Sequence, residues 1–404
     1  MSDDEATDLV MRLMAIPGRS GEEAAVMEAI TGELRAAGVK PSAIKFDNAH
    51  KRSTFSGSGG PAGAGNLIVK LPGTPGDPRG KLPRKMLAAH ADTVPICVGC
   101  TPRRQGGRVV ASPPAKGKGN PATGLGADDR AGCAVVLSTA IALLRSGTPH
   151  PPLTLLFTVQ EEVGLHGARN LAIGQLGSPR LAFNFDGGSP AKITLGATGG
   201  YRMTIRVHGL ASHAGNQPQQ GVSAVAIASL AVADLHQNGW HGLVVKGAKR
   251  GASNVGVISG GQATNVVTDL VTLRAEARSH DAKFRERIVR EIEKAFRRAA
   301  KAVRSDSGVR GSVEFDGVLD YESFRLPDDD PSVRAAAQAV SDEGAEPTLA
   351  VTNGGIDANW LTARGVPTVT LGCGQRQIHT VGEELDLGEF HLARRVALRL
   401  ATAG

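Results

Sequence analysis

The sequence contains few aromatic residues, with ten Phe, two Trp and two Tyr among 404 residues. Proteins that bind single-stranded nucleic acids stack the bases on aromatic side chains, so this scarcity argues against that class although the net charge is +7. No apolar run reaches the roughly 18 residues of a membrane-spanning helix. The acidic start, MSDDEATD, also lacks the positive and apolar regions of a secretory signal peptide. These absences predict a globular protein with no membrane span.

Cysteine is equally scarce, with four in the chain. Four cysteines form no disulfide framework in a chain of this length, so a reducing, cytoplasmic setting fits best. Cys97 and Cys100 form a single C-x-x-C pair, VPICVGC. Because no second pair and no β-α-β redox context accompanies it, we do not favour a zinc or redox role for this pair.

Short apolar runs bounded by turn residues are typical of buried parallel strands, and four are present, at 86–90, 153–159, 181–185 and 367–371. Helical spacing of apolar residues predicts helices at 23–37 and 131–144. The alternation of strands and helices predicts an α/β fold with a doubly wound, mostly parallel sheet. A short strand is expected at 66–71, and the Gly-, Ser- and Pro-rich stretches 50–65 and 99–124 are expected to be loops.

The pattern changes after about residue 197. Strand and helix patterns follow in the order β-α-β-β-α-β of a ferredoxin-like α+β unit, at 201–207, 222–236, 254–258, 266–278, 283–304 and 312–318. Because a further strand and a closing helix of the first type come later, we expect an inserted domain. The predicted division is a catalytic domain at 1–196 and 321–404, with a lid domain at 197–320.

The positive charge is concentrated in the predicted helix 283–304, which carries nine Lys or Arg against three Glu. Apolar residues at helical spacing form its expected buried stripe, namely Ile288, Ile292, Phe296, Ala299 and Val303. We therefore expect the basic groups on the solvent face of this helix. The net charge would then come mainly from one solvent-exposed helix and would not indicate a nucleic-acid-binding surface.

Polar clusters follow the predicted strands at their carboxyl ends, where ligands bind in open α/β sheets. They supply two histidines and several carboxylates, which are ligands that suit Zn, Co or Mn, and their candidate members are His90, Asp92, Asp128, Glu161, Glu162, Asp186 and His379. Two ions roughly 3.5 to 4 Å apart need a bridging carboxylate. The sequence thus predicts a centre of two divalent metal ions.

Two neighbouring glutamates in this set call for different roles. Glu161 and Glu162 cannot both face one ion comfortably, so one can bind metal while the other acts as general base. Asp92 lies two residues after His90 on an extended strand and so projects to the same side. It is well placed to accept the imidazole N–H of His90 and to fix its tautomer.

Six motifs in order, HADTV, GADDRAG, FTVQEEVGLHGA, SHAGNQPQQG, GGQATNVV and GGIDANWLTARGVPTVTLG, resemble those of the M20 family of dinuclear zinc peptidases. The resemblance is strongest to the peptidase T (aminotripeptidase) branch and extends from about Pro17 to the closing helix. Arg130 departs from the family pattern, which usually has Lys after the bridging Asp. Charge is retained there, but the two side chains differ in hydrogen-bond geometry.

The resemblance implies a role for each matching residue. It implies that His90 and Asp186 bind one zinc ion, that Glu162 and His379 bind the other, and that Asp128 bridges the two ions. It also implies that Glu161 is the general base and that Asp92 contacts His90 without binding metal. In the lid, it implies that His213 donates to the scissile carbonyl oxygen. It further implies substrate contacts at Asn265 and Arg278, which would hold a terminal carboxylate, and at the Gly354–Gly355 turn.

The activity implied is hydrolysis of short peptides. An M20-type amidohydrolase or carboxypeptidase acting on N-acyl amino acids or dipeptides is the alternative, because the metal ligands are shared among these enzymes. A basic binding module for nucleic acid or for an acidic partner is a third hypothesis, which the metal-type residues disfavour. A homodimer paired through the lid is a further expectation from the resemblance.

Overall fold

The computed structural model describes residues 1–55, 64–113 and 121–403, and this part of the chain divides into two compact units. The first unit comprises Met1–Gly196, Arg325–Thr352 and Ile356–Gly404, and the second comprises Ala197–Phe324 and Asn353–Gly355. The second unit therefore interrupts the first in the sequence. Residues 321–324 and 353–355, which we expected in the catalytic part, cluster instead with the second unit.

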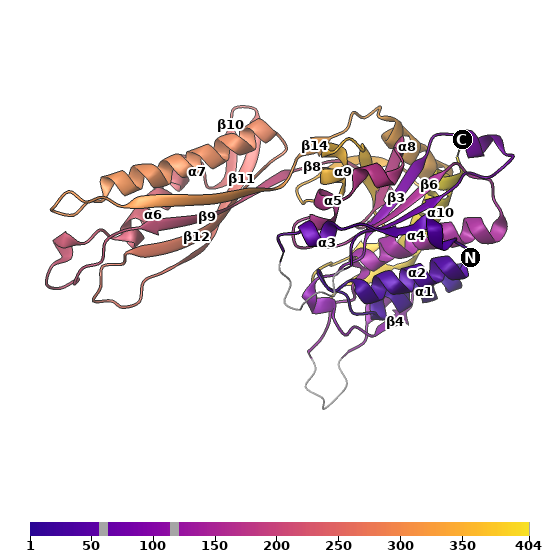
Figure 1. Cartoon of the computed structure of the whole chain (residues 1–404), viewed down its shortest axis with the longest axis horizontal. Coiled ribbons are helices and arrows are strands. Elements are labelled where there is room, and N and C mark those ends of the chain that lie inside the picture. The colour runs from indigo at the N-terminus through magenta and orange to yellow at the C-terminus, as the bar shows by residue number, and fades with distance from the viewer. Residues whose placement is uncertain (56–63, 114–120, 404) are drawn as a thin grey trace. The chain divides into compact units, whose positions relative to one another are not determined.

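A nine-stranded mixed sheet forms the centre of the first unit (Figure 1). Its middle strands β6, β3, β7 and β16 run parallel to one another, whereas β1, β2 and β8 pair antiparallel with their neighbours. Across the sheet the order is β1 (Ile44–Phe46), β2 (Leu67–Leu71), β6 (Leu153–Thr158), β3 (Lys85–His90), β7 (Leu181–Phe185), β16 (Thr368–Leu371), β8 (Lys192–Ala197) and β14 (Phe324–Arg325), with β15 (Thr348–Thr352) also paired to β8.

Helices cover both faces of this sheet (Figure 1). All six residues of β3 are buried, as a strand covered on both faces requires. Met86 and Ala88 pack with Leu361 of α9, while α4 packs against the same strand. The helices of this unit are α1 (Asp3–Ala15), α2 (Ala24–Ala36), α3 (Ala49–Arg52), α4 (Ala127–Ser146), α5 (His166–Asn170), α8 (Pro331–Asp342), α9 (Ala358–Ala363) and α10 (Leu387–Thr402).

The predicted loop 99–124 is wrong over its first part. Residues Pro102–Gln105 form β4 and Arg108–Ala111 form β5, a hairpin that extends through β18 (Glu384–Asp386) and β17 (Gln375–Arg376) into a four-stranded sheet. The hairpin is mostly exposed, so it lacks the alternation of apolar residues by which a strand is recognised. Residues 114–120 of this stretch, and 56–63 of the predicted loop 50–65, lie outside the described residues.

The N-terminal helix was missed, and the start of a second helix differs from the prediction. Helix α1 was not predicted, although Ser2 and Glu5 form a capping box at its start, a signal that the sequence displays. Helix α4 was predicted from Ala131 and extends back to Ala127, but Asp128 and Asp129 in this first part are buried carboxylates with non-helical backbone angles. Apolar periodicity does not register such polar buried positions.

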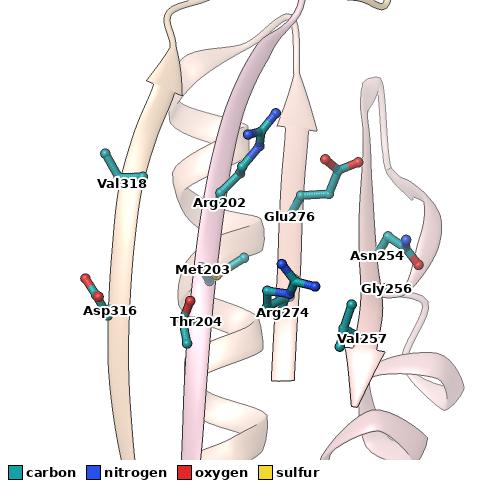
Figure 2. A pocket seen from close by; sticks show the side chains of 11 residues that line it. Arg202, Met203, Thr204, Asn254, Gly256, Val257, Arg274, Glu276, Asp316 and Val318 are labelled. Atoms are coloured by element: carbon teal, nitrogen blue, oxygen red, sulfur yellow. The ribbon is translucent and has the colours of Figure 1, made fainter. Parts of the chain in front are cut away.

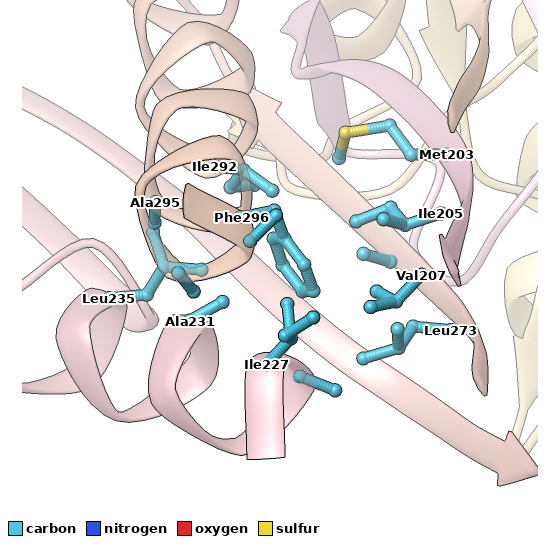
Figure 3. Close-up of a cluster of buried hydrophobic side chains, with 14 of the residues drawn as sticks. Met203, Ile205, Val207, Ile227, Ala231, Leu235, Leu273, Ile292, Ala295 and Phe296 are labelled. Carbon is cyan, nitrogen blue, oxygen red and sulfur yellow. The ribbon is translucent and has the colours of Figure 1, made fainter. Parts of the chain in front are cut away.

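The second unit is a five-stranded antiparallel sheet with helices on one face. Side chains from β9, β12, α6 and α7 form its core (Figure 3). The predicted order lacks one strand, because β10 adds an edge strand before β11. The elements are β9 (Gly199–His208), α6 (Ala224–Gln237), β10 (Gly242–Lys246), β11 (Lys249–Gly260), β12 (Leu270–Ser279), α7 (Ala282–Ala302) and β13 (Ser312–Tyr321).

Helix α7 carries the basic residues that dominate the net charge. Ile288, Ile292, Phe296 and Ala299 are buried as predicted, while Val303 lies just past the helix end and is only partly buried. Arg285 contradicts the expectation that all basic groups face solvent, since it is 3% exposed and forms an ion pair with Glu322 at 2.8 Å. A buried arginine needs such a partner to offset the loss of water.

The described helices include none that combines the length and the apolar character needed to cross a membrane.

Candidate metal centre and active site

Asp128 presents its two carboxylate oxygens to two different histidines. Its Oδ1 atom lies 3.0 Å from Nε2 of His90, and its Oδ2 atom lies 3.1 Å from Nε2 of His379. His90 ends β3 and Asp128 lies in the first turn of α4, so the carboxyl edge of the parallel sheet positions both. This is the arrangement that a carboxylate bridging two metal ions requires.

Two groups of side chains have ligand atoms close enough to hold a metal ion. Ligand atoms of His90, Asp128 and Glu162 all lie within 4.8 Å of one another, as do those of His90, Asp129 and Asp186. Asp129 is a poorer ligand candidate than Asp128, because its carboxylate already accepts hydrogen bonds from the N–H groups of His90 and Gly132 and from Gln375 Nε2, at 3.1, 3.0 and 2.8 Å. The donor set, imidazole nitrogen and carboxylate oxygen, fits divalent Zn, Co or Mn.

The carboxylates of the site are crowded in an environment with little water. Burial raises the pKa of Asp186 to about 7, and the neighbouring Asp128 adds to the effect. Burial likewise raises the pKa of Glu162. Hydrogen bonds that His379 donates to Asp128 and Glu162 raise the pKa of His379 to about 10. So many carboxylates gathered in one place repel one another, and divalent cations would relieve that repulsion.

Asp92 organises both the histidine and the glutamate pair. Its Oδ1 atom lies 3.4 Å from Nδ1 of His90 and accepts the backbone N–H of Glu161 at 3.0 Å. Its Oδ2 atom accepts the backbone N–H of Glu162 at 3.2 Å and the hydroxyl of Ser20 at 2.6 Å. The imidazole Nδ1 also lies 3.1 Å from the Asp92 carbonyl oxygen. Asp92 therefore supports the side of His90 opposite Asp128.

Glu161 is 8% exposed, and within the described chain its carboxylate has no hydrogen-bond partner. Burial raises its pKa well above the ordinary value, while His90 opposes that rise. Glu162, by contrast, places Oε1 3.0 Å from Nε2 of His379. The two adjacent glutamates thus differ in surroundings: Glu162 contacts a predicted ligand, and Glu161 keeps its carboxylate free.

The sequence analysis missed Glu383, which holds the segment leading into Asp128. Its Oε2 atom accepts the backbone N–H groups of Leu125 and Gly126 at 2.8 Å each, and its Oε1 atom accepts that of Asp128 at 3.0 Å. The thiol of Cys97 also donates to Oε2 at 3.3 Å. Glu383 comes four residues after His379, and its 2% exposure could not be read from its polar neighbourhood in the sequence.

Gln375 and Gly132 support the site from the same side and were also missed as structural residues. Gln375 donates to Asp129 Oδ1 and accepts the N–H of Gly187, both at 2.8 Å. A Cβ atom on Gly132 would lie 2.1 Å from the carbonyl oxygen of Phe185 and 2.4 Å from Asp129 Oδ1. Only glycine permits that approach.

Two residues of the site adopt left-handed backbone conformations. Gln160, which precedes Glu161, has φ of 54°, and His379 has φ of 63°. Non-glycine residues rarely adopt such angles, which cluster at functional sites. The first angle directly precedes the general-base candidate Glu161, and the second belongs to the ligand candidate His379.

In the second unit, the structure brings the SHAG and ATNVV motifs together. The N–H of Ala214 donates to the carbonyl of Asn265 at 2.9 Å, and His213 forms an isolated β-bridge with Val266. Nδ1 of His213 accepts the backbone N–H groups of Gly215 and Asn216 at 3.1 and 3.0 Å. The ring proton must then lie on Nε2, which makes that atom of the exposed His213 a hydrogen-bond donor.

Arg278 and Gly355 have partners inside the second unit. Glu276 accepts from Nε and Nη2 of Arg278 at 3.1 and 3.0 Å, and Nη1 lies 3.4 Å from the Asn353 carbonyl oxygen. A Cβ atom on Gly355 would lie 2.9 Å from the ring of Tyr321. The close approach that Gly355 permits is therefore made by Tyr321 in this structure. Gly354 lies beside it in the same unit.

The open face of the second unit's sheet contains a hollow of about 460 Å³ (Figure 2). Val318, Arg202, Glu276 and Asn254 lie opposite one another on four neighbouring strands there. Arg202 pairs with Asp320 at 2.9 Å, and Glu276 pairs with Arg278 at 3.0 Å. These charges are already compensated within the unit.

A comparison with known protein families decides the class of this molecule. Residues 86–403, which include every metal-ligand candidate, match peptidase family M20/M25/M40. The chain belongs to this family. It is a hydrolase of the peptidase class, as the sequence motifs predicted. The predicted mixed α/β fold with a mostly parallel central sheet is confirmed.

Relatives and solved structures of similar fold support this assignment to the M20 family. The chain is 33% identical over 329 residues to the uncharacterized protein YqjE of Bacillus subtilis, a match that covers 81% of each protein. It is similar to the crystal structure of aminopeptidase PepT from Bacillus cereus, with a TM-score of 0.83, 28% identity, and coverage of 99% of this chain and 98% of that one. It is also similar to a tripeptidase from Staphylococcus aureus, with a TM-score of 0.85, 26% identity and the same coverage.

Proposed function

We propose that this M20 peptidase hydrolyses short peptides, with tripeptides as the main substrates, at a centre of two divalent metal ions. The observation that carries the proposal is the placement of Asp128, whose two oxygens face Nε2 of His90 and Nε2 of His379 at 3.0 and 3.1 Å. A carboxylate between two imidazoles has few structural reasons to exist in a buried site, and it matches what a two-metal hydrolase needs. The similarity to an aminopeptidase and to a tripeptidase supports the substrate class.

The residues present fit two such ions, with zinc as the proposed metal. His90 and Asp186 would hold one ion, Glu162 and His379 the other, and Asp128 would contact both. When bound, the ions supply Lewis acidity toward the scissile carbonyl and lower the pKa of water. Asp92 keeps the imidazole of His90 in orientation through its contact at 3.4 Å with Nδ1.

Glu161 is proposed as the general base. Its free carboxylate lies beside Glu162, and its backbone N–H is fixed by Asp92 at 3.0 Å. It would accept a proton from the attacking water and return it to the leaving amine. Burial raises the pKa of Glu161, which is the direction that makes a carboxylate a stronger base.

The second unit is proposed as a lid domain, corresponding to the predicted residues 197–320. Nε2–H of His213 would donate to the carbonyl oxygen that gains charge during attack. Asn265, Arg278 and the Gly354–Gly355 turn would hold the terminal carboxylate of the substrate. In this structure Nε and Nη2 of Arg278 donate to Glu276 and Nη1 donates to the Asn353 carbonyl oxygen at 3.4 Å, so a substrate carboxylate would compete with these acceptors. A cytoplasmic location and pairing of two chains through this unit stay predictions.

The alternative function is amide hydrolysis of N-acyl amino acids, or carboxypeptidase action on dipeptides, by the same metal centre. It needs the same ligands, so a substrate panel separates the two. Metal-loaded protein should be assayed on alanyl-glycyl-glycine, alanyl-glycine and N-acetylalanine, with the metal content of the same sample measured by mass spectrometry. We expect the highest kcat/KM on the tripeptide, and activity that chelation removes and metal restores. Faster turnover of N-acetylalanine would replace the tripeptidase proposal with the alternative.

A further inference from the structure

The segment 159–162 leaves the central sheet where β6 ends at Thr158, and its last two residues are the adjacent glutamates of the site. Val159, Gln160 and Glu161 are buried. Buried backbone N–H groups are costly when they have no acceptor, and beyond the end of the strand these groups need acceptors other than a neighbouring strand. The side chains that accept them therefore decide how the segment is held.

Three side chains, each distant in the sequence, bind the four N–H groups of this segment. Oδ1 of Asn66 accepts the N–H of Val159 at 3.1 Å. Oε1 of Glu23 accepts the N–H of Gln160, also at 3.1 Å. The two oxygens of Asp92 accept the N–H groups of the next two residues, at 3.0 and 3.2 Å. The backbone that carries the general-base candidate is thus held by side chains at every N–H group.

Glu23 is the least expected of these three residues. It lies at the N-cap position of α2 and is fully buried. Its Oε1 atom also accepts the N–H of Gly21 at 2.7 Å, whereas its Oε2 atom has no hydrogen-bond partner in the described chain. Burial raises the pKa of Glu23 to about 7, and Asp92 adds to the rise. A buried carboxyl group with only one oxygen engaged is costly, so a role in stability alone explains it poorly.

The partner of Glu23, Gln160, has the backbone conformation that determines where Glu161 points. Its φ of 54° lies in the left-handed region, which non-glycine residues rarely adopt. Such a conformation persists only where the surroundings hold it. Glu23 binds the N–H of Gln160, and the carbonyl oxygen of Gln160 accepts the N–H of His166 at 3.0 Å. The two bonds fix this residue from both sides.

We propose that Glu23 is a positioning residue for the general base: by accepting the N–H of Gln160, it holds the left-handed turn that orients the carboxylate of Glu161. The inference rests on the proposed function, in which Glu161 takes a proton from the attacking water. Glu23 acts through the backbone of Gln160 and touches neither substrate nor metal. The role requires one accepting oxygen at this position and does not require a negative charge.

Two substitutions at Glu23 separate the accepting oxygen from the size of the side chain. Glu23→Met keeps an unbranched chain but offers no strong acceptor, so kcat on alanyl-glycyl-glycine should fall about 10- to 100-fold while KM changes little. Glu23→Gln keeps an accepting amide oxygen, so its kcat should stay close to the wild-type value. The matched control is Glu28→Met, the same change at an exposed residue of α2, which should keep wild-type kcat and KM.

Two further measurements on the same metal-loaded proteins distinguish positioning from general damage. Metal content should be the same in wild type and in every variant, because no proposed ligand is changed. Hydrogen exchange, followed by mass spectrometry on a fragment that contains Gln160, should be faster in Glu23→Met than in wild type or Glu23→Gln, because a released amide opens more readily. Glu23→Leu, which also lacks an acceptor, replaces Glu23→Met in all of these measurements if the Met variant does not fold.

Three results would overturn the role of Glu23. A wild-type kcat in Glu23→Met would show that the contact with Gln160 does not matter for turnover. Loss of metal in Glu23→Met would show that Glu23 supports the metal centre and not the general base. An equal fall of kcat in Glu23→Gln and Glu23→Met would show that its charge is what matters, beside the buried guanidinium of Arg130. A wild-type protein that binds two ions but cleaves no short peptide would instead overturn the proposed function.

Discussion

The backbone N–H of Asp128 donates to Oε1 of Glu383 at 3.0 Å. The other oxygen of the same carboxylate accepts the N–H groups of Leu125 and Gly126 at 2.8 Å each. One buried side chain thus accepts three backbone N–H groups from the segment 125–128, which carries the proposed bridging carboxylate. Glu383 therefore positions the backbone of Asp128, and these contacts involve no side chain of a proposed metal ligand.

We expect Glu383→Gln to weaken metal binding about 10- to 100-fold, the usual effect of losing a group that orients a metal ligand. The amide nitrogen of Gln cannot accept a hydrogen bond, so at least one of the three backbone N–H groups loses its partner. Metal affinity should be measured by competition with a chelating dye. Glu384→Gln is the matched control, because Glu384 pairs with Arg108, whose side chain is 52% exposed. Equal affinities in the two variants would refute this role of Glu383.

Asp92→Asn should lower kcat and metal affinity together. Asp92 accepts from Ser20 and from the N–H groups of Glu161 and Glu162, at 2.6, 3.0 and 3.2 Å. An amide group satisfies fewer of these donors and also contacts His90 with the wrong polarity. We expect losses of about 10- to 100-fold in metal affinity. A surface substitution, Asp77→Asn, should leave both quantities unchanged, and a wild-type affinity in Asp92→Asn would count against the assigned contact.

Phe296→Ala should destabilise the second unit by about 3–5 kcal/mol, the range for removing a buried aromatic side chain. Phe296 is fully buried in the core formed by α6, α7 and the sheet (Figure 3). Trp240 packs against that core, so its fluorescence in a Trp360→Phe background reports on this unit during urea unfolding. Val225→Ala, at a residue 47% exposed on α6, should shift the transition little. Similar shifts in both variants would contradict the packing described.

Lys85 should make stability depend on pH in the alkaline range. Its amine donates to the carbonyl oxygens of Leu400 and Ala403 at 2.8 and 2.7 Å, and burial lowers its pKa from 10.5 to about 8. Between these values the unfolded chain keeps a proton that the folded chain has released, so the free energy of unfolding rises with pH.

The test for Lys85 compares wild type with Lys85→Met. The difference in unfolding free energy between the two should grow in favour of wild type from pH 8 to pH 10.5, because contributions from other groups cancel in the difference. Lys81→Met, at an exposed position, should show no such trend relative to wild type. A difference for Lys85→Met that stays constant over this range would show that its pKa is not lowered by folding.

The sequence predicted the strands of the central sheet well for a physical reason. β3, β6, β7 and β16 are buried on both faces, and such strands must be continuous apolar runs. The same reasoning failed for β4, whose exposed residues leave no apolar pattern, and for β10, whose short apolar run Leu243–Val245 is buried only at Val244. Edge and surface strands are specified by pairing with distant segments, which a local pattern does not record.

Several ligand candidates could be proposed because they lie at or just after a strand end, as His90 ends β3 and Asp186 follows β7. The residues that hold them could not. Glu383 lies in a loop and Gln375 in the two-residue strand β17, and both contact groups far away in the sequence, so neither has a local signal. For Arg278 the resemblance implied a contact with the substrate's terminal carboxylate, and the sequence did not show that Glu276, two residues earlier on the same strand face, occupies two of its donors.

The most direct test of the account is to measure metal content and turnover together in wild type and in Glu161→Gln. The variant removes the proposed general base and keeps every proposed ligand. We predict two divalent metal ions per chain in both proteins and a fall in kcat on a tripeptide of about 10²- to 10⁴-fold in the variant. Wild-type turnover in Glu161→Gln, or fewer than two ions in the active wild-type protein, would contradict the central claim.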